Sequence, residues 1–330
     1  MSLIRKPSQL APKSTISILI YGAPGMGKST LACSAPNPIL FDADGGVQRI
    51  NGAHQVDTVQ ITRWEDVVGD ERSSDPDLRI GALGVIARDE AAGLCHYDTI
   101  VFDTVGKTLD YMSDYIIRHN PKMGQRDGSL SLKGFGERKV MFINLIKRLS
   151  VMGKSVVFVA HEREDKQGEQ TYKRPDIGGS SAGDLIKELD LVGYMTAYGN
   201  ERIISFDPNE LYIAKNACNL APNMKVPVVV DRETGNAIGQ NNFLAQIIAS
   251  YEAWQARQRQ QTAAYEALVN DITAAIDAAD TADDLNALLK SIGQKEAIWN
   301  SKLVAFQKMN LRASRIGAKY DPINKCYVAA

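Results

Sequence analysis

Nine consecutive residues near the amino terminus combine glycines, one lysine and two hydroxyl groups at a spacing that suits a phosphate group. The run reads GAPGMGKST, and Lys28 and Ser29 follow its last glycine. Glycines let the backbone curl so that its N–H groups face an anion, while the lysine reaches the β- and γ-phosphates and the serine hydroxyl ligates Mg²⁺. We therefore expect ATP and Mg²⁺ at this P-loop, bound by Gly22, Ala23, Pro24, Gly25, Met26, Gly27, Lys28, Ser29 and Thr30.

A strand before this run and a helix after it are needed to hold it in place. Residues 17–21 are apolar and predict a buried strand of a parallel sheet, and residues 27–34 predict a short helix that Pro36 stops. Strand, loop and helix follow one another in the order in which this motif binds phosphate. A glycine-rich turn with a chance lysine is the alternative, and the complete pattern in this context argues against it.

A second apolar run ends in a carboxylate. Residues 99–102, TIVF, predict another buried strand, which Asp103 closes. When such a strand lies in the same sheet, its terminal carboxylate lies beside the P-loop and holds Mg²⁺ directly or through water. We expect Ser29 and Asp103 to be the metal ligands.

Apolar strand patterns alternate with helical patterns as far as residue 230. This alternation predicts an α/β fold with a mostly parallel sheet. From Phe243 onward, alanine, glutamine and leucine recur at helical spacing and predict a C-terminal helical appendage, with helices over about 243–279, 282–292 and 294–314. We divide the chain into an N-terminal tail (1–14), a P-loop core (15–230), a linker (231–242) and a helical C-terminal region (243–330).

Four short segments of the core occur in an order that resembles the RecA-like recombinases. They are FDAD, which ends at Asp44; VVFVAH, which ends at His161; a Gly-Gly pair followed by a helical pattern; and YIAKN, which contains Lys215. The match covers residues 15–230. It looks most like the compact RecA-like P-loop ATPases of bacteriophages, which include single-strand annealing proteins of phage recombination.

This resemblance implies roles for three residues. Asp44 activates the attacking water, His161 senses the γ-phosphate, and Lys215 reaches across a subunit interface to the neighbour's ATP, which implies a homo-oligomer. A turn cap at Asp44 and a core histidine at His161 are the alternative interpretations. The family's longer N-terminal polymerisation segment has no counterpart before the first strand, so we do not expect long filaments.

In RecA-like cores two loops bind single-stranded DNA, and this chain has a candidate for each. Residues 120–136 are rich in glycine and lysine, and the wider segment 118–139 has six basic residues against two acidic ones. A basic loop with an aromatic ring suits sequence-tolerant binding of single strands. The second candidate, 162–181, is nearly balanced in charge, and solvated surface loops are the alternative for both. The expected DNA contacts are Lys122, Arg126, Lys133 and Phe135 in the first loop and Lys173 and Arg174 in the second.

The composition is that of an ordinary globular protein and restricts the other function classes. The net charge is −1, so any contact with nucleic acid has to come from a local basic patch. The four cysteines are far apart and include no CxxC pair, so we expect neither a zinc site nor a disulfide framework. No apolar run approaches the ~18 residues of a membrane span, and the amino terminus lacks a signal-peptide pattern, so we expect a cytoplasmic protein without membrane contact.

Two further functions are compatible with a P-loop. A nucleotide-switched assembly or adaptor ATPase would use its helical C-terminal region to bind a partner protein. A small-molecule kinase is disfavoured, because no arginine-rich lid follows the strand that ends at Asp103. The basic segment 118–139 favours an ATPase stimulated by DNA.

Overall fold

The computed structural model describes residues 5–10, 15–167, 170–178, 181–199 and 201–330. The chain divides into two compact units, one over residues 15–251 and one over residues 252–330, to which residues 5–10 also belong. The division therefore falls inside helix α7 (Phe243–Asp277) rather than in the expected linker 231–242. The reason is that residues 226–245 hydrogen-bond to the first unit, as described below.

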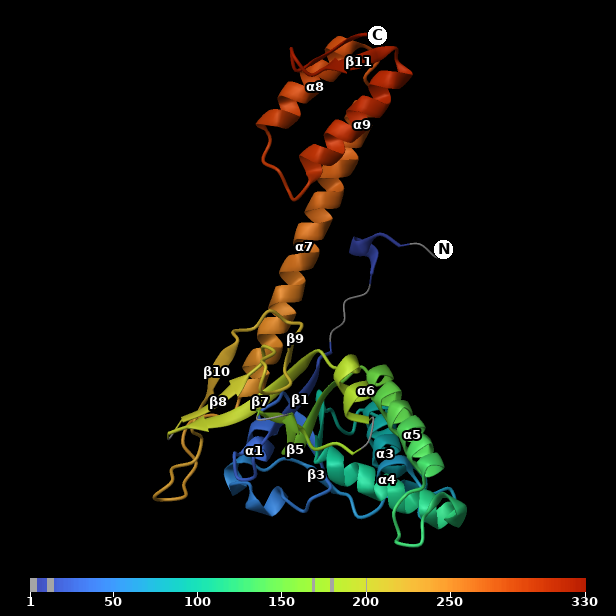
Figure 1. Cartoon of the computed structure of the whole chain (residues 1–330), viewed down its shortest axis with the longest axis vertical. Helices are drawn as coiled ribbons and strands as arrows, with labels where there is room; N and C mark the ends of the chain where they lie inside the picture. Colours follow the sequence, from blue (N-terminus) through green and yellow to red (C-terminus); the bar gives the residue numbers. More distant parts are fainter. Residues whose placement is uncertain (1–4, 11–14, 168–169, 179–180, 200) are drawn as a thin grey trace. The chain divides into compact units, whose positions relative to one another are not determined.

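A mostly parallel sheet organises the first unit (Figure 1). The strand order is β10-β8-β7-β1-β5-β4-β2-β3. The strands from β7 to β3 are parallel to one another. At one side of the sheet, β8 is antiparallel to β7 and β10 is antiparallel to β8. The expected α/β fold with a helical C-terminal region is confirmed. The strands are β1 (Ser17–Gly22), β2 (Pro38–Asp42), β3 (Thr58–Gln60), β4 (Thr99–Asp103), β5 (Ser155–Gln167), β6 (Gln170–Pro175), β7 (Leu191–Tyr198), β8 (Glu201–Ser205), β9 (Lys215–Asn216) and β10 (Asn223–Val226).

Helices cover the sheet and explain why its central strands are continuously apolar. Alternate residues of the central strands, such as Leu19, Phe41, Phe102 and Phe158, join one core with side chains of the helices α3 to α6. Residues between them in the strands are buried as well, as expected of a parallel sheet covered on both faces. The helices of this unit are α1 (Lys28–Ala32), α2 (Glu65–Val68), α3 (Pro76–Ala91), α4 (Val105–His119), α5 (Leu132–Val151) and α6 (Ser181–Glu188), with 3₁₀ turns η2 (Val47–Arg49), η3 (Gly52–His54) and η4 (Pro121–Met123).

Both expected loops have more regular structure than the sequence indicated. The stretch after His161 continues β5 and returns as β6, so it is an antiparallel hairpin. The first loop contains η4 and the first turn of α5, which begins at Leu132 and is capped by Ser131, whose hydroxyl accepts from Gly134 N. Only the turn between η4 and α5 is irregular.

The second unit contains a feature that the sequence analysis missed. Helices α8 (Ala282–Gln294) and α9 (Ser301–Arg315) are followed by a hairpin of β11 (Ala318–Asp321) and β12 (Cys326–Ala329). Tyr327 anchors the hairpin, because its backbone exchanges hydrogen bonds with the Asn286 side chain. Near the amino terminus, η1 (Pro7–Gln9) belongs to the same unit, and Ser8 donates to Glu266. Within the described residues, no helix has both the length and the apolar character to cross a bilayer.

Candidate nucleotide site

The P-loop joins the carboxyl end of β1 to the start of α1. Gly25 and Gly27 have φ values of +78° and +82°, a left-handed region in which a side chain is strained. Lys28 is buried, and its ammonium donates to the carbonyls of Gly22 and Ala23 at 3.0 and 2.8 Å. Burial lowers the pKa of Lys28, and nearby carboxylates partly offset this effect. The ammonium is thus held within the loop that we expect to receive the phosphates.

Strand register brings a carboxylate and an imidazole to the same edge of the sheet. Gly22 pairs with His161 at the end of the shared β1–β5 ladder, and Asp103 lies at the carboxyl end of β4 on the other side of β5. Asp103 is buried, and burial raises its pKa. A hydrogen bond from Ser29 opposes this shift, while the negative charge of Asp44 adds to it.

Two aspartates at the end of β2 have different surroundings. Asp42 is buried, and its two carboxylate oxygens accept from the backbone N–H groups of Gly46 and Val47, both at 2.9 Å. Asp44 instead lies 3.4 Å from Nε2 of His161. The turn-stabilising role that was the alternative for Asp44 is therefore filled by Asp42.

These groups line one cavity of about 310 Å³. The structure brings Asp44, Asp103 and His161 together with six of the predicted P-loop residues, Lys28 and Ser29 among them. The sequence analysis missed two neighbours. Arg49 lines the cavity, and Glu162 contributes negative charge near Lys28 while it accepts from Tyr194 Oη at 3.0 Å. The lining residues are Pro24, Gly25, Gly27, Lys28, Ser29, Thr30, Asp44, Gly46, Arg49, Ile50, Asp103 and His161.

The donor set of this cavity fits Mg²⁺. The Ser29 hydroxyl and the Asp44 carboxylate both lie close enough to Asp103 to shift its pKa, Ser29 downward and Asp44 upward. Hard oxygen donors of this kind suit a small divalent cation, and a cation would offset the repulsion between the carboxylates. Ser29 and Asp103 would hold the ion, as the sequence predicts.

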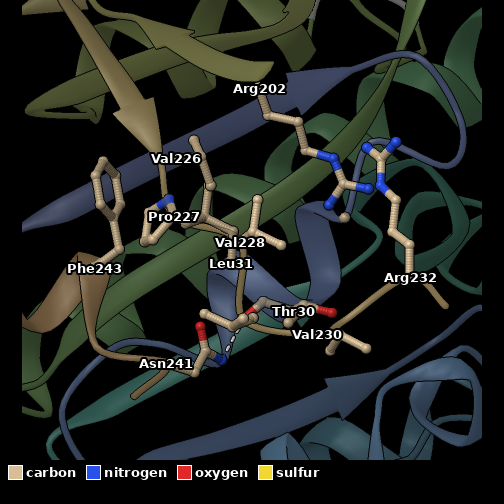
Figure 2. A pocket seen from close by; sticks show the side chains of 12 residues that line it. Thr30, Leu31, Arg202, Val226, Pro227, Val228, Val230, Arg232, Asn241 and Phe243 are labelled. Atoms are coloured by element: carbon tan, nitrogen blue, oxygen red, sulfur yellow. Dashed lines mark hydrogen bonds between the residues drawn. The ribbon is translucent and has the colours of Figure 1, made fainter. Parts of the chain in front are cut away.

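A second cavity, of about 210 Å³, also adjoins the P-loop and shares Gly27 and Thr30 with the first (Figure 2). Gly27, Thr30 and Leu31 form one wall. Arg202 of β8 and the segment 226–243, which we call the strap, supply the rest. Figure 2 shows the side chains of Arg202 and Arg232 toward one end of the cavity, with the apolar side chains of Val228, Pro227 and Phe243 beyond them. The lining strap residues are Val226, Pro227, Val228, Val229, Val230, Arg232, Asn241 and Phe243.

Hydrogen bonds fasten the strap to the P-loop side of the unit. Asn241 donates through Nδ2 to the Thr30 carbonyl at 2.8 Å, and Asn51 donates to the Gly235 carbonyl at 2.7 Å. His54 Nε2 lies 2.9 Å from the Val229 carbonyl. Most of the segment interpreted as a linker is therefore part of the cavity wall, which no local sequence pattern indicated.

Lys215 lies away from the nucleotide cavities of its own chain. In β9 it pairs with Val192, near the start of β7, whereas the P-loop strand meets β7 at its later residue Met195. The Lys215 ammonium donates to the carbonyls of Ile186 and Lys187, both at 3.1 Å, and so caps the end of α6. Its action on a neighbouring subunit stays a prediction, and this contact would have to break for it.

The first basic segment has fewer available charges than its sequence suggests. Arg118 pairs with Glu65 at 3.0 Å, Lys139 pairs with Asp184 at 2.8 Å, and Arg138 is buried. Lys122, Arg126 and Lys133 are exposed and form no ion pair within the described part of the chain. Phe135 is 40% exposed, and the Arg138 guanidinium lies 4.9 Å from its ring centroid.

The cations expected in the second loop are paired within their own hairpin. Lys173 contacts Glu162 at 3.1 Å and also Glu164, and Arg174 lies 2.7 Å from Asp165. Their charges are therefore largely neutralised. In the antiparallel register Lys173 lies opposite Glu164, and Asp165 is two positions along from the partner of Arg174. The DNA contacts expected at Lys173 and Arg174 stay a prediction, and these ion pairs would have to open for them.

Comparison with protein families gives one match over most of the chain. A family model described as "AAA domain" matches residues 14–218, which include the P-loop, both metal-ligand candidates, Asp44 and His161. A prophage-derived uncharacterized protein, YorG of Bacillus subtilis strain 168, is 24% identical over 185 residues, which are 55% of this chain and 51% of the relative. The chain thus matches about half the length of that relative.

Three solved structures are also similar, at low scores. A KaiC-like protein of Pyrococcus horikoshii has a TM-score of 0.30 at 11% identity, over 59% of this chain and 78% of that one. The flagellar accessory protein FlaH of Methanocaldococcus jannaschii has a TM-score of 0.33 at 9% identity, over 64% and 84%. An ATPase of the type III secretion system of pathogenic bacteria has a TM-score of 0.34 at 13% identity, over 55% and 52%.

Proposed function

The chain belongs to the AAA domain family, and from this premise we propose that it is a Mg²⁺-dependent ATP hydrolase that acts on single-stranded DNA. Annealing or pairing of strands in recombination of the phage type is the activity that we favour. The proposal includes a homo-oligomer, in which Lys215 contacts the nucleotide of a neighbour.

The residues of the nucleotide site divide the work of hydrolysis. Lys28 and the P-loop N–H groups bind the phosphates, and their charge stabilises the transferring group without reorganisation. Mg²⁺, when bound by Ser29 and Asp103, neutralises charge on the phosphate oxygens. Asp44 accepts a proton from the attacking water, and His161, 3.4 Å from it, orients that carboxylate and contacts the γ-phosphate.

One observation carries the DNA part of the proposal. Three cations are exposed after α4, Lys122 in η4, Arg126 in the following turn and Lys133 in the first turn of α5, and within the residues described here they pair with no carboxylate. An exposed cation with no partner is available to replace the counterions of a phosphate backbone. The neighbouring aromatic ring of Phe135 offers a partly exposed surface on which a base can stack.

The position of this segment agrees with a path near the nucleotide. α4 begins directly after β4, at the carboxyl edge of the sheet, and α5 ends just before β5 starts at the opposite edge. α5 has 20 residues and is thus about 30 Å long, more than a central strand of five or six residues spans. Figure 1 shows the turn between η4 and α5 at the far end of this helix, at the bottom of the view. α5 thus holds the segment about one helix length away from the edge at which β5 starts.

Salt dependence of DNA binding tests the proposal. Fluorescence anisotropy with a poly-dT oligonucleotide should give a linear relation of log K to log salt, with a slope of about −0.7 per phosphate neutralised. Changing Lys122, Arg126 and Lys133 together to glutamine should flatten the slope by about two units. The matched control changes Lys147 and Arg148, exposed cations farther along α5, and should leave the slope unchanged. A triple variant with the wild-type slope would remove this segment from the DNA path.

A second candidate function rests on the C-terminal unit. Leu303 and Leu311 lie two turns apart on α9 and are 56% and 64% exposed. Such an apolar face favours an adaptor ATPase that binds a partner protein through its helices. This candidate predicts that the wild-type protein binds DNA weakly and that changing Lys122, Arg126 and Lys133 leaves this binding as it is.

A further inference from the structure

Two arginines line one cavity beside the P-loop. Arg202 comes from β8 and Arg232 from the strap, and both line the cavity formed with Gly27 and Thr30 (Figure 2). Among the residues that the structure describes, neither guanidinium forms an ion pair or a side-chain hydrogen bond. The nearest acid in sequence to Arg202, Glu201, is paired with Lys225 instead.

Strand pairing and close contact fix where Arg202 lies. It pairs with Ala197 of β7 and with Val226 of β10, the first residue of the strap. A Cβ atom placed on Gly27 would come within 2.6 Å of Nη1 of Arg202. The guanidinium therefore lies directly against the P-loop backbone, where a side chain at residue 27 would displace it.

Unpaired guanidinium groups in contact with a phosphate-binding loop are suited to one class of ligand. Two like charges that line one cavity repel each other, and an anion bound in that cavity offsets the repulsion. The planar guanidinium donates two parallel hydrogen bonds to phosphate oxygens, so phosphate is the anion that it binds best.

We propose that Arg202 and Arg232 form a clamp that binds the α- and β-phosphates of the nucleotide in cis, opposite the magnesium side of the P-loop. The inference rests on the proposed nucleotide binding and deepens it. Lys28, Ser29 and Asp103 line the other cavity and serve the β- and γ-phosphates and the metal ion. The arginine cavity is lined by Gly27 and by Thr30 in the first turn of α1, next to the glycine-rich backbone whose N–H groups face the α- and β-phosphates in this motif.

The strap connects this clamp to the nucleoside. Val228, Pro227 and Phe243 form the apolar part of the cavity that lies beyond the arginines in Figure 2. The hydrogen bond from Asn241 to the Thr30 carbonyl holds the strap against the P-loop. One segment thus supplies both an arginine for the phosphates and an apolar wall for the base.

Calorimetric titration of the full-length protein with unlabelled Mg²⁺-ATP and Mg²⁺-ADP tests the clamp. Arg202→Gln and Arg232→Gln should each weaken both nucleotides by about tenfold, as expected for one charge-assisted contact. Because the contact is to phosphates that ATP and ADP share, the ratio of their Kd values should stay within about threefold of wild type. Arg72→Gln, at an exposed arginine before α3, is the matched control and should bind as wild type does.

The outcomes separate the clamp from the function on which it rests. If both arginine variants bind ATP with the affinity of the wild type, the clamp is overturned and the proposed ATPase function stands. A loss for ATP with no loss for ADP would also overturn it, since the arginines would then reach the γ-phosphate. Failure of the wild type to bind either nucleotide would reject the proposed function itself. Arg232 lies on an exposed turn, so its variant gives the result even if Arg202→Gln fails to fold.

Discussion

Asp42 and Asp44 lie two residues apart, and changing each to asparagine should have opposite consequences. Asp44 lines the phosphate cavity 3.4 Å from His161. Removing a general base slows a reaction by about 10²–10⁴-fold, so Asp44→Asn should reduce ATP turnover by that factor. Nucleotide affinity should persist, because the change also removes a negative charge from a site that receives phosphates.

Asp42 should instead affect stability. Its two oxygens accept from Gly46 and Val47 N–H groups at 2.9 Å, and the side chain is buried. An asparagine keeps one acceptor and turns its NH₂ group toward the other N–H donor. The loss of one charge-assisted hydrogen bond, with a buried donor left unpaired, should lower the free energy of unfolding by about 2–3 kcal/mol.

The assay combines urea unfolding with initial rates of phosphate release at saturating ATP. Rates are compared at a temperature at which both variants are folded. We expect Asp42→Asn to be less stable but active, and Asp44→Asn to be as stable as wild type but inactive. Normal turnover by Asp44→Asn would refute its assignment as the base. Equal inactivity of a folded Asp42→Asn protein would refute the distinction between the two residues.

Three further predictions concern the metal, the assembly and the DNA. Asp103→Asn should weaken nucleotide binding in Mg²⁺ and leave the weaker binding in EDTA unchanged, because an amide is a poorer ligand for a hard cation; equal losses in both buffers would contradict this. Lys215→Ala and Lys28→Ala should each be inactive alone and should partly restore turnover when mixed. A Lys28→Ala subunit still offers Lys215 to a neighbour whose P-loop is intact. No recovery in a confirmed assembly would count against action between subunits. Phe135→Ala should weaken binding to poly-dT by about 1–3 kcal/mol through lost stacking, with an unchanged salt slope; a changed slope would argue against a stacking role.

The nucleotide site could be predicted from sequence where its residues are contiguous or end a strand. The P-loop is one run of nine residues, and Asp103 and His161 each end an apolar run that is visible as a strand. Parallel strands present their carboxyl ends at one edge, so these separate segments were expected to meet. Asp44 and Asp42 could be told apart only by their hydrogen bonds.

The second cavity could not be predicted, because it is formed by segments that share no local pattern. Arg202, Arg232 and the P-loop come together only through the antiparallel strands β8 and β10 and through the contact between Asn241 and Thr30. The strap contains glycines and polar residues, which are typical of a linker. Tertiary hydrogen bonds give it a defined position.

The β5–β6 hairpin and the start of α5 were both predicted as loops, for different physical reasons. β5 beyond His161 and β6 are almost entirely polar, so no apolar alternation marks them as strands, and cross-strand ion pairs stabilise the hairpin instead. The start of α5 contains Gly134, which has low helix propensity. A Cβ there would lie 2.6 Å from the Met123 carbonyl oxygen, so the close approach of η4 accounts for the glycine.

The central claim is that the P-loop binds and hydrolyses ATP, and turnover by wild type and Lys28→Ala tests it most directly. Lys28 is buried at the start of α1, and its charge has no substitute among the P-loop residues. Phosphate release should require Mg²⁺ in the wild type and fall by about 10²–10³-fold in Lys28→Ala, with both proteins showing the same cooperative unfolding. If folded Lys28→Ala turns over ATP at a rate within about twofold of wild type, the P-loop assignment is contradicted. Loss of such a charged contact should slow turnover far more than that.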